Sequence, residues 1–230
     1  MAHLNLEAVD TDGALREAAE EVAGDTRLDF LRKGALTGGA ALSGGAILSA
    51  LLPGAASAKT SGGAPPAKFG KDDVGILNYA LTLEYLESTF YTEATANNVA
   101  AGDKQLGQLL KTVTADEAFH VKLLKTALGK KAIKKPKFDF GAAVKDKTTF
   151  AATTFVLENT GVHAYLGQAP NIKAAKVLLV AASIVTVEAR HSGAIGLYLG
   201  KPIAPSGPLD TGLPASAILA AVKKTGFIVG

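Results

Sequence analysis

Two stretches decide the fold, Glu117-Ala118-Phe119-His120 and Glu188-Ala189-Arg190-His191, and both follow the pattern Glu-x-x-His. Residues three apart on an α-helix lie on the same face, so the glutamate and the histidine of each stretch can reach one metal ion together. A single such pair is typical of a solvent-exposed helix face. The second copy is what favours a metal site.

Each copy has a glutamate upstream at a similar distance. Roughly 30 residues separate Glu84 from Glu117, and a similar gap separates Glu158 from Glu188. A gap of that length accommodates half a helix, a turn and half a helix back, so the two glutamates of each pair lie at similar depth in an antiparallel hairpin. The order Glu, Glu-x-x-His, Glu, Glu-x-x-His is that of di-metal carboxylate sites inside four-helix bundles.

The distribution of glutamates supports burial of these residues. After Glu93 the chain contains only three glutamates, and they are Glu117, Glu158 and Glu188. An apolar run, residues 181–187, directly precedes Glu188. Burying an ionised carboxylate among apolar residues is costly unless it is paired or binds a metal, and metal binding explains all three positions at once.

The spacing of apolar residues predicts an all-α fold. We expect two antiparallel hairpins and a short C-terminal fifth helix, with helices over about residues 72–95, 104–128, 148–166, 172–199 and 214–225. The lysine-rich segment 129–147, which contains Pro136, is too polar for a buried helix and fits a long crossover between the hairpins.

The N-terminal part of the chain favours an export signal. Residues 26–58 combine basic residues, a Gly/Ala/Leu-rich run and the cleavage-type sequence Ala56-Ser57-Ala58. The segment resembles a twin-arginine signal in which Leu28 takes the place of the second arginine. We therefore expect an exported protein, in the cell envelope, the periplasm or outside the cell. The alternative is a retained apolar anchor or arm, which would add a membrane contact.

The other divisions follow from composition. Residues 1–25 are an acidic tail, 59–70 a linker, 71–200 the four-helix bundle and 201–230 a C-terminal extension. The chain has 230 residues, a formal net charge of +3 and no cysteine. Nucleic acid is not an expected partner, because the charge is small and basic residues are not interleaved with aromatics. Any metal must be held by histidine and carboxylate ligands.

Over residues 72–199 the chain resembles the ferritin-like superfamily. Residues 78–87, Asn-Tyr-Ala-Leu-Thr-Leu-Glu-Tyr-Leu-Glu, are similar to the first helix of its secreted branch, which includes bacterial ferritin-like domain proteins and plant desiccation-related proteins. The resemblance implies two iron ions or two manganese ions. It also implies that Glu117 and Glu188 bridge the metals, while Glu84 with His120 and Glu158 with His191 complete the two ligand sets.

Two tyrosines, a glutamate and a histidine are further candidates for the site. Tyr91 and Tyr165 each follow an upstream glutamate by two helical turns; the resemblance implies a hydrogen bond to a bridging carboxylate or a redox-active neighbour, and the alternative is an ordinary core aromatic. Glu87 is set aside as a ligand because Gly161 holds the equivalent position in the second hairpin. His163 is expected to face a neighbouring element or solvent.

These features predict a di-metal protein that reacts with dioxygen or hydrogen peroxide, as a ferroxidase or a peroxidase- or catalase-like oxidoreductase. Two alternatives share the fold. One is a non-catalytic protein of stress or desiccation protection in which the metal is structural. The other is an envelope interaction or assembly module. Expected partners are metal ions, the oxygen species and, if the chain assembles, further copies of itself as a homo-oligomer.

Overall fold

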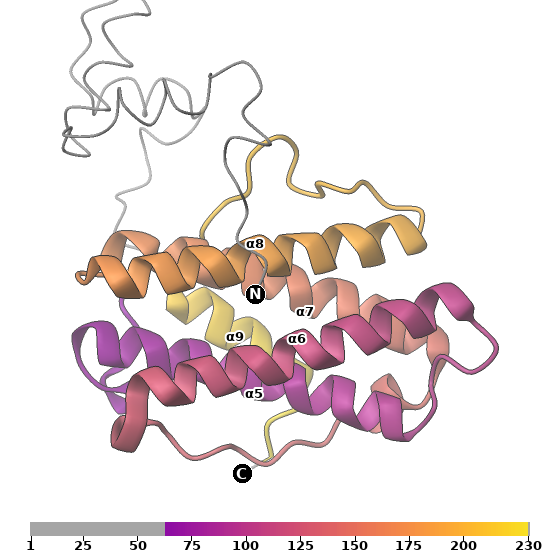
Figure 1. Ribbon diagram of the computed structural model, residues 1–230, viewed down its shortest axis with the longest axis horizontal. Coiled ribbons are helices and arrows are strands. Elements are labelled where there is room, and N and C mark those ends of the chain that lie inside the picture. The colour runs from indigo at the N-terminus through magenta and orange to yellow at the C-terminus, as the bar shows by residue number, and fades with distance from the viewer. Residues whose placement is uncertain (1–62, 230) are drawn as a thin grey trace, which may run out of the picture. The chain divides into compact units, whose positions relative to one another are not determined.

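The structure, a computed structural model, describes residues 63–229 and is mostly helical over that range (Figure 1). Its long helices are α5 (Asp72–Ala96), α6 (Lys104–Leu128), α7 (Lys147–Gln168) and α8 (Ala175–Tyr198), and the shorter α9 (Ala215–Thr225) follows. The described residues form no β-strand beyond one isolated bridge. The prediction of an all-α bundle with a short fifth helix is confirmed. The acidic tail and the export segment lie outside the described residues.

The helices form two hairpins, α5 with α6 and α7 with α8. Figure 1 shows the crossover, residues 129–146, running along the bottom of the view for the length of the bundle. Contacts of Asp103, at the start of α6, show which helix ends meet. Its carboxylate accepts a hydrogen bond from Tyr198 at the end of α8 (2.7 Å). The same carboxylate lies 3.8 Å from Lys147 at the start of α7. Helices α6 and α7 therefore run parallel, as a long crossover requires.

Local sequence sets the helix ends. Asp103 and Asp146 cap α6 and α7, each accepting a hydrogen bond from the backbone N–H three residues on, at 3.0 and 2.7 Å. The start of α8 is three residues later than the apolar spacing predicts. Asp73 on α5 explains this, because its carboxylate accepts hydrogen bonds from the backbone N–H groups of Lys173 and Ala174, both at 2.8 Å, just before the helix begins.

Buried Asn78 ties the crossover to α5. Its side-chain nitrogen donates to the carbonyl oxygens of Phe69 (2.9 Å) and Lys131 (3.0 Å), and its side-chain oxygen accepts from the N–H of Ile133 (3.0 Å). At the other end of the crossover, the N–H of Asp139 donates to Phe227 O at 2.9 Å. The C-terminal extension is therefore packed against the bundle.

The apolar core falls into two clusters along the helices. One contains the stacked rings of Phe90 and Phe150, whose centroids are 5.3 Å apart, and the other contains Leu81, Leu124 and Ile184. On α6 and α8 the Glu-x-x-His residues come between the positions that contribute to the two clusters. The polar site is thus flanked by packed hydrophobic layers. Helix α8 is long and apolar enough to cross a membrane, a property shared by core helices of soluble bundles.

A turn before α9 crosses α7 at very close range. His163 contacts Thr211, with its Nδ1 2.5 Å from the carbonyl oxygen, and the N–H of Leu213 donates to His163 O at 2.9 Å. His163 therefore faces a neighbouring element. At Gly167 an added Cβ would lie 1.9 Å from the Leu213 carbonyl oxygen. Only glycine fits at this crossing.

We expect Gly167→Ala to destabilise the protein by about 1–3 kcal/mol, because the new methyl group must push backbone atoms apart. The measurement is the free energy of unfolding in urea. Gly107→Ala on α6 is the matched control: its added Cβ would meet only Ala100, at 4.0 Å, so helix propensity should make it neutral or stabilising by up to about 1 kcal/mol. Equal effects of the two variants would contradict the close crossing.

Candidate metal centre

The structure brings together all six side chains that the sequence singled out as ligands. Each of the four helices contributes a glutamate, and α6 and α8 also contribute the histidines: Glu84, Glu117, His120, Glu158, Glu188 and His191. The four glutamates are 0% exposed and the two histidines 4%. Six ionisable side chains thus share the interior of the bundle.

These side chains form two overlapping groups that could each hold a metal ion. One group is Glu84, Glu117, His120 and Glu188; the other is Glu117, Glu158, Glu188 and His191. Within a group the candidate ligand atoms lie within 4.8 Å of one another. Glu117 and Glu188 belong to both groups, so the two positions adjoin.

Each histidine points one ring nitrogen at three carboxylates. Nδ1 of His120 lies 3.3 Å from a Glu84 oxygen, 3.3 Å from a Glu117 oxygen and 3.1 Å from a Glu188 oxygen. Nδ1 of His191 lies 3.3, 3.2 and 3.8 Å from oxygens of Glu117, Glu158 and Glu188. One N–H cannot satisfy three acceptors well. The convergence of imidazole and carboxylates from different helices is the arrangement of ligands around a cation.

Several buried carboxylate oxygens accept no hydrogen bond from the described residues: Glu84 Oε2, Glu117 Oε1 and both oxygens of Glu188. An unsatisfied buried oxygen of an ionised group is costly, and a bound cation removes that cost. Carboxylate and imidazole ligands together suit iron and manganese as well as zinc. The residues present fit a metal centre.

Residues 72–201 match the family model described as the ferritin-like domain. The chain belongs to this family. No curated protein matches the chain significantly. Family membership and the buried Glu/His groups together make this a ferritin-like protein with a centre that could bind metal.

In this ferritin-like domain the two tyrosines bond across the bundle. The hydroxyl of Tyr165 on α7 donates to Glu84 Oε1 on α5 at 2.5 Å, and the hydroxyl of Tyr91 on α5 donates to Glu158 Oε1 on α7. The partner is therefore the upstream glutamate of the other hairpin, and not one of the two shared glutamates that the resemblance implied. Burial, reinforced by the nearby carboxylates, raises the pKa of both phenols well above the usual value, so both remain neutral donors.

Glu87, which the pattern argument set aside, lies buried beside the cluster at 3% exposure. A Cβ added at Gly161 would lie 3.6 Å from Glu87 Oε1 and 3.7 Å from Glu188 Oε2. A methyl group would fit there at ordinary contact distance, and Gly161 therefore packs directly beside the carboxyl of Glu87. Burial raises the pKa of Glu87 well above its usual value, and the neighbouring glutamates, Glu188 foremost, raise it further.

Asp116 was missed by the sequence reasoning. Its Oδ2 lies 3.0 Å from Nε2 of His191, while its side chain is 41% exposed. A carboxylate at this place orients the ring and fixes which nitrogen carries the proton. On α8 the equivalent position is Val187, so the pseudo-symmetric arrangement is broken here as well. The feature of the sequence that could have indicated this contact is the acidic residue immediately before the first Glu-x-x-His.

The metal-free cluster holds protons. Burial raises the pKa of Glu117 well above its usual value and that of Glu158 to about 7. For His120, burial alone would lower the pKa, but the carboxylates of Glu117, Glu188 and Glu84 around its Nδ1 raise it to about 12. The pKa of His191 is likewise raised, by the carboxylates of Glu117, Glu158 and Glu188. Glu188 is the exception, because the close approach of both histidine rings, His120 foremost, outweighs burial and lowers its pKa to about 2.

We expect the metal-free protein to melt at a lower temperature at about pH 7.5 than at about pH 5.5. Over this window the unfolded chain releases protons from its histidines and has already released those of its glutamates. The folded chain keeps protons on both histidines and on Glu87, Glu117 and, up to about pH 7, Glu158. The native state binds more protons, so stability falls as pH rises. Glu188 is ionised in both states and adds no slope.

The matched variants are Glu158→Gln and Glu93→Gln, measured by thermal melting at both pH values. Glu158→Gln removes one of the contributing carboxyls and should flatten the pH dependence. Glu93→Gln changes a glutamate on α5 outside the cluster and should leave it unchanged. A metal-free protein that is more stable at the higher pH would show that these groups are not buried together.

Proposed function

We propose that this ferritin-like domain binds two divalent ions, iron or manganese, one in each group, with Glu117 and Glu188 shared between them. The observation that carries the proposal is the convergence of each histidine Nδ1 with three carboxylates. Two adjoining groups with two common glutamates favour a pair of ions over a single one.

We infer that the protein is an oxidoreductase that acts on dioxygen or hydrogen peroxide. Two such ions supply two electrons, which with two protons reduce dioxygen to hydrogen peroxide, or hydrogen peroxide to two waters. The chain's own residues suit this chemistry. Glu87 retains a proton beside the cluster and belongs to neither ligand group. The two neutral tyrosines occupy one oxygen each of Glu84 and Glu158, which leaves the second oxygens for the ions.

The expected metal content is two ions per chain after ferrous or manganous loading, measured by elemental analysis. Replacing both His120 and His191 with alanine should remove most of it, because each group then loses its only nitrogen ligand. The ferrous protein should be oxidised by dioxygen or peroxide, and repeatedly so while excess ferrous iron is supplied. Metal without turnover would instead support the structural role, and a chain that stays metal-free after loading would rule out the centre.

Asp116→Ala tests the support of His191. It should weaken binding of one of the two ions by about 10–100-fold, since His191 loses the partner of its outer nitrogen. The control is Val187→Ala, at the pseudo-equivalent position on α8, which should change metal affinity little. Titration followed by calorimetry resolves the two ions.

We also propose that residues 26–58 direct export. The support is the sequence alone: a basic region, an apolar run and Ala56-Ser57-Ala58 in that order. The mature protein should then begin near Lys59, which intact-mass spectrometry of protein from its native cell measures. A native envelope protein that retains residues 1–58 would favour the apolar anchor.

A further inference from the structure

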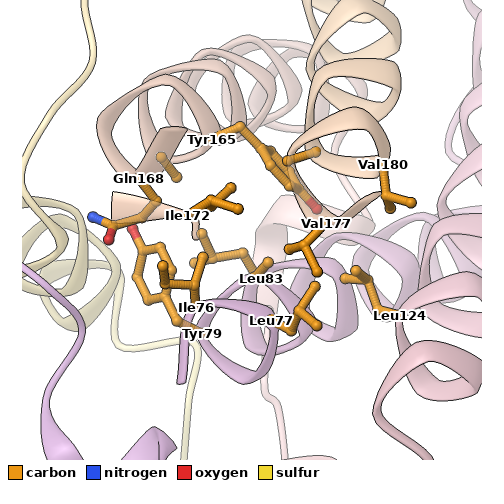
Figure 2. Close-up of a pocket in the computed structure, with 13 residues that line it drawn as sticks. Ile76, Leu77, Tyr79, Leu83, Leu124, Tyr165, Gln168, Ile172, Val177 and Val180 are labelled. Carbon is orange, nitrogen blue, oxygen red and sulfur yellow. The ribbon is translucent and has the colours of Figure 1, made fainter. Parts of the chain in front are cut away.

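An apolar cavity lies beside one half of the cluster (Figure 2). Its free volume, ≈ 10 Å³, is about what one water-sized molecule requires. The residues that line it present only carbon atoms to its inner surface. Figure 2 shows Leu77, Leu83 and Tyr79 of α5 on one side and Tyr165 of α7 reaching in from another.

The wall adjoins the Glu84–His120 group. Ala80, one helical turn before Glu84, and Leu83, directly before Glu84, both line the cavity. Leu124 lines it too, one turn after His120 on α6. Tyr165 belongs to the wall and also donates its hydroxyl hydrogen bond to Glu84 at 2.5 Å. One tyrosine thus stands between the cavity and the first ligand group.

The cavity has a buried floor and an accessible rim. Ala80, Leu83 and Leu124 are at most 6% exposed. Ile172, before α8, and Val177, in its first turn, also line the cavity and are only partly buried. The apolar lining therefore extends from residues next to Glu84 to partly exposed residues at the start of α8.

We propose that this cavity admits dioxygen to the Glu84–His120 half of the centre. Dioxygen, and not hydrogen peroxide, would then be the oxidant that enters through the cavity. The inference rests on the proposed function for its metal chemistry. Dioxygen is apolar and loses no hydrogen bonds on entering a carbon-lined space. Water and hydrogen peroxide carry O–H groups that this wall cannot satisfy, so their entry is penalised.

The first test detects dioxygen in the cavity without any metal. Methyl signals of the full-length, metal-free chain are recorded under dioxygen pressure, because paramagnetic dioxygen speeds the relaxation of nearby nuclei. Leu83 and Leu124 should relax faster than Leu106 and Val113, which are also buried but do not line the cavity. Equal enhancement in both sets would overturn the proposal.

The second test blocks the rim. Val177→Phe places a ring at the opening and should reduce both the methyl relaxation and, in the ferrous-loaded protein, the rate of oxidation by dioxygen severalfold. Oxidation by hydrogen peroxide should change much less. The matched control is Leu179→Phe on the same helix, where the side chain is 68% exposed and outside the cavity wall; it should change neither rate.

The outcomes separate this inference from the proposed function. Equal slowing of both oxidants by Val177→Phe would overturn the dioxygen path. A ferrous-loaded protein that neither oxidant oxidises would overturn the proposed function, while the methyl relaxation of the metal-free chain still decides whether dioxygen enters the cavity.

Discussion

The structure depends on the burial of glutamates at the centre of an apolar bundle. Glu84, Glu87, Glu117, Glu158 and Glu188 are all at most 3% exposed. Leaving one buried charge without a partner costs about 3–5 kcal/mol, against a typical total stability of about 5–15 kcal/mol. The cluster is tolerable only because each helix delivers its carboxylate to the same depth, where histidines, tyrosine hydroxyls and protons or cations compensate it. The site therefore forms only when the four helices pack in the register that brings these carboxylates together.

Protons would compete with a bound metal ion for this cluster. In the metal-free chain, raised pKa values keep several carboxyls neutral and both histidines charged, and Glu188 is the carboxylate that those histidines hold ionised. Ligands must lose their protons to bind an ion, so loading releases protons and becomes more favourable as pH rises. The acidity of the surroundings therefore sets how readily the centre fills. The hydrophobic layers on both sides strengthen this coupling, because they exclude the water that would otherwise solvate the charges.

The helical repeat explains what the sequence could predict. Two copies of Glu-x-x-His, each with an upstream glutamate, determine which helix faces meet, and the hairpins and the six side chains followed from that. The errors arose where the argument assumed matched positions. Glu87 was set aside for lacking a counterpart, although its carboxyl is buried beside Gly161, the residue at the equivalent position. The contacts of Asp116 and of the tyrosines depend on how one hairpin packs on the other, which spacing along a single helix does not encode.

The departures from two-fold symmetry make the halves of the centre different. On the Glu158–His191 side, Asp116 lies against the outer nitrogen of the histidine, and Gly161 packs beside the carboxyl of Glu87. On the Glu84–His120 side, the equivalent of Asp116 is Val187, and the neighbourhood is the carbon-lined cavity bounded by Tyr165. A carboxylate behind a ligand strengthens its hold on an ion, whereas an apolar approach favours exchange of small uncharged molecules. Under the proposed function, the Glu158–His191 half would hold its ion more firmly and the Glu84–His120 half would exchange small uncharged molecules more readily, a difference that a symmetric pair of hairpins would not provide.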